Sequence, residues 1–235
     1  MMNKQGNLYT ILYIIVIVVV VGAALAFTSL SLKDKQNENI AADNMRQILA
    51  SLHIVPAQDS ILEVFDKVIT RQFIVDSKAN VIDGEAFAVD IASEVKRPAD
   101  ERKLPVYEAA VTDGSVKYVL PIYGAGLWGP IWGYVAMDSD GSTIFGAYFA
   151  HQGETPGLGA EIEKPKFSAE FVGKQMFKDD VFKPIAVVKA GQHPATGEDY
   201  VDGVSGGTIT SKGVNDMLAE CLRPYEMYLQ TLRNK

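Results

Sequence analysis

The chain has 235 residues, of which 48% are hydrophobic and 22% are charged, and its formal net charge is −7. This length is enough for one large domain with a real core. The acidic balance and the lack of any Lys/Arg-rich run argue against nucleic acid as a partner, because phosphate backbones bind basic surfaces. The one cysteine, Cys221, excludes an internal disulfide and a CxxC metal site. It lies at helical spacing among apolar residues, which predicts a small buried side chain rather than a reactive thiol.

The N-terminal part contains a long apolar segment. No charged residue occurs between Leu8 and Leu32, and the stretch Ile11–Ala26 is almost entirely Ile, Val, Leu and Ala. About 20 such residues span the hydrocarbon core of a bilayer as a helix. We therefore predict a transmembrane anchor within residues 1–35, followed by a folded domain over residues 36–235.

The sequence alone does not determine whether this segment is cleaved or which way it is oriented in the membrane. The tripeptide Ala24–Ala26 resembles a signal-peptide cleavage site, but the apolar stretch exceeds the roughly 7–15 residues of a signal peptide, which favours retention. Lys4 precedes the segment, whereas Lys33 and Lys35 follow it, so the distribution of positive charge does not settle the orientation.

After the anchor, the pattern predicts two helices and then a series of strands. Apolar positions recur with helical period over Asn37–Leu52, and a second helix, capped by Asp59 or Ser60, extends to about Ile69. The strand-like runs are Phe73–Val75, Val106–Ala110, Val116–Ile122, Ile131–Met137 and Thr143–Phe149. The segment Asp138–Gly141 is typical of a hairpin turn between the last two strands.

The C-terminal third is predicted to alternate between short elements and loop. We expect a short helix at Ser168–Phe177, a strand at Phe182–Val188, a loop at Gly191–Gly207 and an amphipathic helix from about Ser211, interrupted at Pro224. The complete series predicts an α+β fold, a twisted and mainly antiparallel sheet flanked by helices, preceded by one N-terminal transmembrane helix.

A GxGxxG match at Gly124–Gly129 lacks the context of a dinucleotide site. That fingerprint requires a helix to begin at the glycines, whereas Pro130 and another strand-like run follow here. A calcium-loop match at Asp138–Gly141 also fails, since Phe149 stands where the loop needs a bidentate Glu. The sequence therefore predicts no NAD site and no metal site.

A GxSxG match at Gly203–Gly207 would indicate the nucleophile of a serine hydrolase. That motif needs a buried strand before the serine and a histidine after it. The residues before Ser205 do not predict a buried strand, and all three histidines precede it. We predict no catalytic residue in this chain.

The segment Val201–Val214 is the strongest candidate for a binding site. It places two adjacent glycines and four hydroxyl residues at the start of the amphipathic helix. Glycines allow close approach of a bulky group, and a helix start offers free N–H groups to a phosphate. The same residues also fit an ordinary capped turn with Thr210 or Ser211 as the N-cap, and physical reasoning alone leaves both interpretations open.

A resemblance decides between them. The segment Asp202–Thr208 resembles the flavinylation motif Asp-x-x-Ser/Thr-Gly-Ala-Thr of the C subunit of sodium-translocating NADH:quinone reductases (Nqr), and of the related G subunit of Rnf complexes. Tyr123–Trp128 and His151–Gly159 are similar to two further segments of the Nqr C subunit and occur in the same order. One difference is Gly207, which stands where the motif usually has Ala.

This resemblance implies a covalent cofactor. In that family a dedicated flavin transferase esterifies the last Thr of the motif with the phosphate of FMN, which here implies a phosphoester at Thr208. The other residues implied to surround the cofactor are Asp202, Gly203, Ser205, Gly206, Gly207, Trp128, Glu154, Thr155, Leu158 and Gly159. Because a carboxylate repels a phosphate, we expect Asp202 to shape the loop or to serve the transferase rather than to contact FMN.

Two further residues have alternative roles. Lys189, at the end of a predicted strand, either stabilises negative charge on a reduced flavin or remains a solvated surface lysine. His151 either hydrogen-bonds the flavin ring or caps its own loop.

The resemblance also implies the function. The chain would be an electron carrier that relays electrons through FMN inside a membrane complex with the other Nqr subunits, whose assembly pumps sodium. Its folded domain would lie on the outer, periplasmic side of the cytoplasmic membrane. An Rnf-type G subunit is the alternative within the same class, and a cofactor-free, membrane-tethered binding module is the alternative from a different class.

Overall fold

The computed structural model describes residues 7–234, which divide into two units, one up to Asn44 and one from Met45 onward. The first unit belongs to α1 (Asn7–Ser51), a single helix that includes both the predicted anchor and the predicted helix Asn37–Leu52. By length and composition this helix is able to cross a membrane, and none of its most apolar window is buried inside the protein. The prediction of an apolar N-terminal helix is confirmed.

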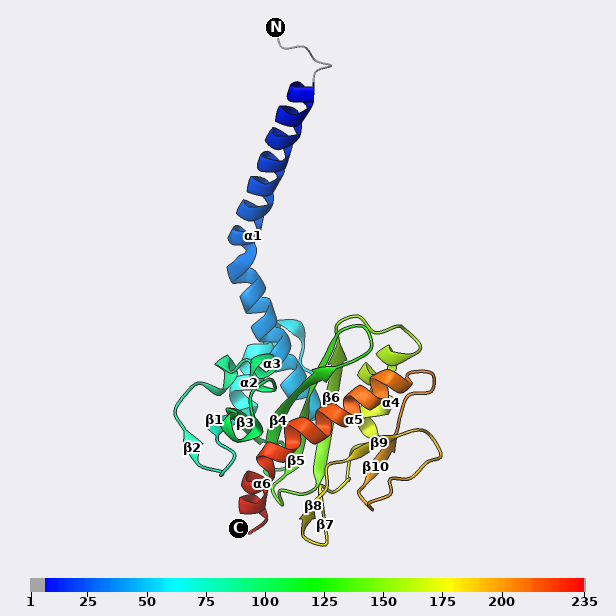
Figure 1. Cartoon of the computed structure of the whole chain (residues 1–235). Helices are drawn as coiled ribbons and strands as arrows, with labels where there is room; N and C mark the ends of the chain where they lie inside the picture. Colours follow the sequence, from blue (N-terminus) through cyan, green and yellow to red (C-terminus); the bar gives the residue numbers. More distant parts are fainter. Residues whose placement is uncertain (1–6, 235) are drawn as a thin grey trace. The chain divides into compact units, whose positions relative to one another are not determined.

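The second unit is built on a six-stranded sheet in the order β2-β1-β3-β4-β5-β6, in which every neighbouring pair is antiparallel (Figure 1). Its strands are β1 (Ile69–Val75), β2 (Val81–Ile82), β3 (Leu104–Ala110), β4 (Val116–Ala125), β5 (Pro130–Asp138) and β6 (Ile144–His151). The hairpin predicted between β5 and β6 is confirmed, because Gly141 N–H donates to Asp138 O at 3.0 Å with Gly141 at a φ of +65°. The predicted α+β fold with a mainly antiparallel sheet is therefore confirmed.

Helices cover both faces of this sheet. Successive side chains of a strand point to opposite faces, so Leu120 packs in the cluster with α5 (Thr208–Leu222) while its neighbour Val119 packs with α2 (Ile61–Val68). The end of α1 also packs on the second face, through Ile48 and Leu49. The helix α6 (Glu226–Arg233) continues the cover of the first face. Short helical turns connect these elements: η1 (Gln58–Ser60), η2 (Ala86–Ala88), α3 (Ile91–Glu94), η3 (Ala99–Glu101) and η4 (Gly159–Glu163).

The predicted helix Ser168–Phe177 is wrong. The helix α4 (Pro165–Ala169) ends earlier, and the chain then runs along the edge of β6, where Gly173 N–H donates to Ile144 O and Lys174 O accepts from Ile144 N–H, each at 2.8 Å. Gly173 has a φ of +77°, which ends a helix readily. Pairing of the backbone with a distant strand thus replaced the local helical preference.

The predicted strand Phe182–Val188 is divided into two. The first part, β8 (Val181–Phe182), pairs with β7 (Phe177–Lys178), whereas β9 (Ala186–Val188) pairs in parallel with β10 (Tyr200–Asp202). Pro184 lies at the break, where its missing N–H prevents a continuous ladder. The strand β10 occupies part of the segment that was predicted to be loop.

The last helix begins three residues before its predicted start. Its N-cap is Gly207 and its first residue is Thr208, so neither Thr210 nor Ser211 is the cap. As predicted, Pro224 interrupts the C-terminal helix, in the turn η5 (Arg223–Tyr225) between α5 and α6.

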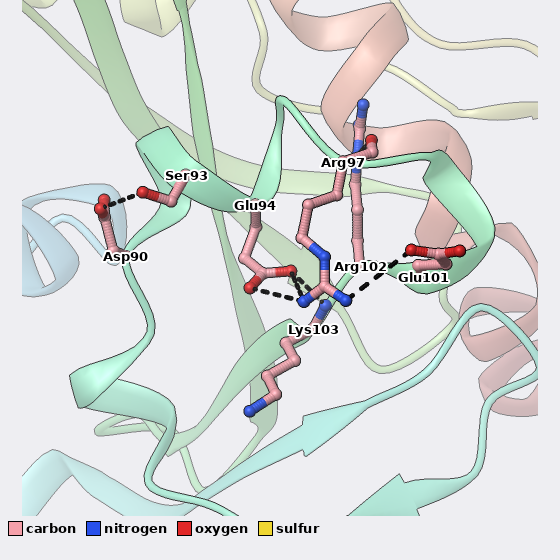
Figure 2. A network of polar contacts seen from close by, with 7 residues as sticks. All are labelled: Asp90, Ser93, Glu94, Arg97, Glu101, Arg102 and Lys103. Carbon is pink, nitrogen blue, oxygen red and sulfur yellow. Dashed lines mark hydrogen bonds and ion pairs between the residues drawn. The ribbon is translucent and has the colours of Figure 1, made fainter.

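The far end of α5 is held by a buried arginine. Arg102 is 6% exposed and donates to the carbonyl oxygens of Val95, Arg97 and Glu220, and also to Glu220 Oε1 at 2.6 Å. Figure 2 shows Arg102 beside Arg97, which lies between Glu94 and Glu101 at the surface. The segment before β3 is thereby joined to the C-terminal turn of α5.

Replacement of this arginine is expected to destabilise the second unit. Arg102→Ala leaves buried carbonyl oxygens without a donor, and we expect a loss of about 2 kcal/mol in the free energy of unfolding. Arg97→Ala is the matched control, since the Arg97 side chain is 44% exposed and the ion pairs of such a side chain contribute about 1 kcal/mol or less. Denaturant unfolding of the detergent-solubilised chain measures both, and equal effects of the two substitutions would contradict the role of Arg102.

Candidate functional site

A cavity of about 620 Å³ opens beside the start of α5. Its walls are β9 with the residues that follow it, the loop around Pro194–Thr196, the segment Gly203–Gly206 and one side of α5. Pockets that bind small molecules in proteins have volumes of about 300–1,000 Å³. The cavity therefore has the size expected for a cofactor or substrate.

The first turn of α5 presents N–H groups that have no partner inside the helix, although the N–H of the N-cap Gly207 donates to Val204 O at 3.0 Å. The first four N–H groups of a helix lack intrahelical partners, and within residues 7–234 no side chain caps this helix at Gly207. These groups also form the positive end of the helix dipole. Thr208 is the first residue of the helix; it is exposed and borders the cavity. A hydroxyl group and an anion-binding helix start thus occur at one place.

The loop before Thr208 is folded tightly by its own hydrogen bonds. Gly203 N–H donates to Val188 O at 2.6 Å, and Val204 N–H donates to Ser211 Oγ at 2.9 Å. Gly206 has a φ of +77°, which favours glycine. Ser205 and Gly206 border the cavity, whereas Gly207 is buried. The loop predicted from the motif is therefore a defined wall of the cavity.

Two of the predicted site residues, Lys189 and Asp202, border different cavities. Lys189 follows β9 and borders the same cavity as Thr208. Asp202, in contrast, borders a different cavity of about 410 Å³, together with Lys174, His193 and Tyr200. The structure thus brings Lys189 and Thr208 together but separates Asp202 from their cavity.

Glu154 is a buried carboxylate close to the helix start. It is 5% exposed, and its two oxygens accept hydrogen bonds from Trp128 N–H at 2.8 Å and from Thr210 Oγ at 2.5 Å. Gly159 is also buried, and a Cβ at this position would overlap Glu154 and Thr210. Both residues thus support the site from within the protein.

His151 fits the loop-cap alternative. Its Nδ1 accepts a hydrogen bond from Glu154 N–H at 3.1 Å, and its Nε2 lies 3.4 Å from Glu163 Oε2. This arrangement places the ring proton on Nε2, because Nδ1 must act as the acceptor. Both ring nitrogens are therefore used within the loop.

A group of exposed apolar side chains, here called the apolar rim, lies near Thr208. Its members are Leu127, Trp128, Leu158 and Ile209, with exposed fractions of 47%, 67%, 43% and 58%. Leu158 is close to the loop, since a Cβ on Gly206 would lie 2.6 Å from Leu158 Cδ2. Thr155 is exposed in the same turn as Leu158, whose N–H donates to Thr155 O. The rim and the cavity are separate surfaces, because no rim residue borders the cavity among the residues that the structure describes.

Three residues of α5 belong to the site but were not among the residues predicted to surround the cofactor. Ser211 and Asn215 border the cavity, and each accepts a hydrogen bond from a wall of it: Val204 N–H for Ser211 and Val187 N–H at 3.0 Å for Asn215. Thr210 contacts Glu154 on the other side of the helix. A signal for the first two existed, since Thr208, Ser211 and Asn215 have the spacing of one helix face.

The glycines of the GxGxxG match have a packing role. The strand β5 follows them, as predicted, rather than a helix. A Cβ on Gly124 of the match would lie 2.8 Å from Met217 Cβ in α5. On the opposite side of this contact, a Cβ on Gly213, a glycine of α5 itself, would overlap Ala125 O. These glycines therefore allow α5 to approach the end of β4 closely.

The other short motifs also have local explanations. Asp140 accepts hydrogen bonds from the N–H groups of Ser142 and Thr143 at 2.8 Å, which makes the calcium-like sequence a turn. A short strand, β10, does precede the GxSxG match, but only its middle residue, Val201, is buried, so it is not the buried strand that this motif needs. The histidine order still disagrees with that motif. Cys221 is buried as predicted, and burial raises the pKa of its thiol to about 11.

Comparison with known proteins places these features in a family. The family model described as FMN-binding domain matches residues 126–223, which include the apolar rim, the loop between β6 and η4 that carries Glu154, and α5. The chain is 36% identical over 228 residues to the C subunit of the Na(+)-translocating NADH-quinone reductase of Vibrio anguillarum, covering 90% of this chain and 89% of that protein. It is 33% identical over 227 residues to the same subunit of Yersinia pestis, covering 88% and 85%.

Solved structures show the same fold. The crystal structure of the C subunit of the Na(+)-translocating NADH-quinone reductase from Parabacteroides distasonis matches with a TM-score of 0.79 and 47% identity, covering 84% of this chain and 96% of that one. Shewanella oneidensis NqrC matches with a TM-score of 0.69 and 24% identity, covering 83% and 98%, a likeness that concerns the fold alone. With this fold, this site and these relatives, the chain belongs to the family of the C subunit of the Na(+)-translocating NADH-quinone reductase.

Proposed function

We propose that the chain relays electrons through an FMN that is attached to Thr208 by a phosphoester bond. The observation that carries this proposal is the position of Thr208, a hydroxyl residue that borders a cofactor-sized cavity at a helix start which no side chain of residues 7–234 caps. The free N–H groups and the helix dipole at this place favour a phosphate. When bound, FMN supplies the redox chemistry, and the protein supplies its position and surroundings.

The proposed tether needs an external enzyme. A threonine hydroxyl is a weak nucleophile unless a base activates it. The carboxylate of Glu154 accepts from Trp128 and Thr210, so it is not free to act as that base. In His151, Nδ1 accepts from Glu154 N–H and Nε2 faces Glu163 in η4, so this ring is not free to do so either. This supports attachment by a flavin transferase, as the resemblance implies. The separation of Asp202 from the cavity supports a role for its carboxylate in loop shape or in recognition by that transferase.

The other residues have distinct proposed roles. Gly203, Ser205, Gly206 and Gly207 form the loop that lets a bulky group approach Thr208. Lys189 places a positive charge at the cavity, where it stabilises negative charge on a reduced flavin ring that lies in the cavity; a ring that lies on the apolar rim leaves Lys189 as a solvated surface lysine. The exposed rim members Trp128 and Leu158, together with Thr155, offer a surface to a flat ring, whereas the buried residues Glu154 and Gly159 support that surface from behind.

The place of the chain in the cell follows from its anchor and its family. As a member of the NqrC family it works with the other subunits of an NADH-quinone reductase, and we propose that this assembly translocates Na⁺. We also propose that α1 anchors the chain in the cytoplasmic membrane with the folded unit on the outer side. The quoted relatives are C subunits, which favours an Nqr complex over an Rnf complex.

The test is expression of the full chain with and without a flavin transferase, followed by a denaturing gel. We expect a fluorescent band at the mass of the chain only when the transferase is present, because denaturation releases any cofactor that is not covalently bound. A chain that is membrane-inserted and co-expressed with an active transferase, yet not fluorescent, would favour the cofactor-free binding module instead.

A further inference from the structure

The carboxylate of Glu154 lies in a closed niche rather than at the surface of the site. It is 5% exposed, and its niche is bordered by two glycines, Gly126 and Gly159. A Cβ on either glycine would overlap the carboxylate oxygens. Because no other residue type leaves this space, the backbone is built around the carboxylate of Glu154.

Glu154 joins two segments that are distant in the sequence. Its Oε1 accepts from the backbone N–H of Trp128, at the turn between β4 and β5, at 2.8 Å. Its Oε2 accepts from Thr210 Oγ, in the first turn of α5, at 2.5 Å. A buried carboxylate is tolerated when donors satisfy it, and hydrogen bonds to a charged acceptor are roughly twice as strong as neutral ones.

The orientation of Glu154 is itself fixed. Its backbone N–H donates to Nδ1 of His151, whose other ring nitrogen faces Glu163. The turn that follows is closed by hydrogen bonds from Leu158 N–H and Ala160 N–H to Thr155 O, each at 3.1 Å. The carboxylate is therefore held from its own side as well as by its two partners.

We propose that Glu154 is a positioning residue that holds the first turn of α5 against the Leu127–Trp128 turn and so fixes Thr208 for flavin attachment. This inference rests on the proposed function. Thr208 lies two residues before Thr210 in the same helical turn, and this turn has no side-chain cap at Gly207 within the described residues. The Thr210–Glu154 hydrogen bond stabilises this end of the helix, as a cap usually does.

Glu154→Ala and Glu154→Gln distinguish positioning from charge. Alanine removes both hydrogen bonds. Glutamine keeps them without the charge, since its oxygen accepts from Trp128 N–H and its amide donates to the Thr210 hydroxyl oxygen. The full-length chains are incubated with a flavin transferase and its flavin donor, and the initial rate of covalent labelling is measured from in-gel fluorescence per amount of folded protein.

We expect Glu154→Ala to lower this rate about tenfold, because a displaced nucleophile reacts far more slowly. Glu154→Gln is expected to stay within about twofold of the wild-type rate, a rescue that a loss of charge would not allow. Glu161→Ala is the matched control, because Glu161 is a nearby carboxylate, in η4, that accepts a hydrogen bond from Gly157 N–H and makes none to α5 among the described residues. We expect this variant to be labelled at the wild-type rate.

If Glu154→Ala does not fold, Thr210→Val tests the positioning role instead. This substitution removes only the hydrogen bond between Glu154 and α5, and it is expected to slow labelling. If the wild-type chain is labelled and Glu154→Ala is labelled at the same rate, the positioning role is overturned. Where Glu154→Ala does not fold, an unchanged rate in Thr210→Val overturns it instead. Equal slowing in Glu154→Ala and Glu154→Gln would also overturn it. Absence of labelling in the wild-type chain, in contrast, would contradict the proposed function itself.

Discussion

Thr208→Val is expected to abolish covalent flavin attachment without changing the fold. Valine has nearly the same shape as threonine but lacks the hydroxyl oxygen that the proposed phosphoester requires. Thr208 is exposed at the first position of α5, so this substitution leaves no buried polar group unpaired. The expected result is complete loss of in-gel flavin fluorescence, with a change in the free energy of unfolding below about 0.5 kcal/mol.

The matched control for this prediction is Thr208→Ser. Serine keeps the hydroxyl and removes only a methyl group, so labelling is expected to persist at a reduced level. The neighbouring hydroxyl residues Ser205, Thr210 and Ser211 provide an internal test of specificity, because they remain present in both variants. Fluorescence retained in Thr208→Val would therefore assign the attachment to another residue.

Gly213→Val is expected to produce the largest loss of stability among these substitutions. A Cβ on Gly213 would overlap the carbonyl oxygen of Ala125, a backbone atom that has no other rotamer to adopt. The helix α5 and the end of β4 must then separate, and overpacking of this kind typically costs about 1–3 kcal/mol. We expect about 3 kcal/mol, seen as a lower urea midpoint with an unchanged slope.

Gly153→Ala is the corresponding control. In the part of the chain that the structure describes, no atom lies within 4 Å of a Cβ built at Gly153, which is also exposed. Its stability is expected to change by less than about 0.5 kcal/mol. The fluorescence of Trp132 reports on both variants, because its indole N–H donates to the buried Gln47 and this contact is lost on unfolding. A Gly213→Val chain as stable as the wild type would show that the close approach of α5 and β4 is not required.

Much of the fold was predictable because strands and helices leave strong patterns. The five strands predicted from Phe73 to Phe149 all occur, with ends that differ by a few residues. The interruption at Pro224 follows from the chemistry of proline alone. These features depend on local sequence, which is why they can be derived without coordinates.

The failures have a common physical cause. The segment Ser168–Phe177 became an edge pairing with β6 instead of a helix, and Tyr200–Asp202 became a strand because β9 supplied a parallel partner. In both cases a contact between residues far apart in the sequence determined the backbone. Local preference does not contain that information.

The residues of the site likewise divide into those that local sequence predicts and those whose roles depend on contacts between distant segments. The motif identified Thr208, and the pattern of α5 predicted a helix start near it, although three residues later than the observed one. The separation of Asp202 from the cavity and the contact between Glu154 and Thr210 required the structure, because they depend on how β10, α5 and the loop after β6 pack. Glu154 is the clearest case: in the sequence it is one residue of a cofactor loop, whereas in the structure it is a buried support.

The central claim is that Thr208 carries the FMN, and the most direct test is mass spectrometry of the tryptic peptide Ala190–Lys212 from a chain co-expressed with a flavin transferase. The account predicts a peptide heavier by one FMN less one water, with fragment ions that place the added mass on Thr208. An unmodified peptide from a fluorescent chain, or fragment ions that place the mass on Ser205, Thr210 or another residue, would contradict it.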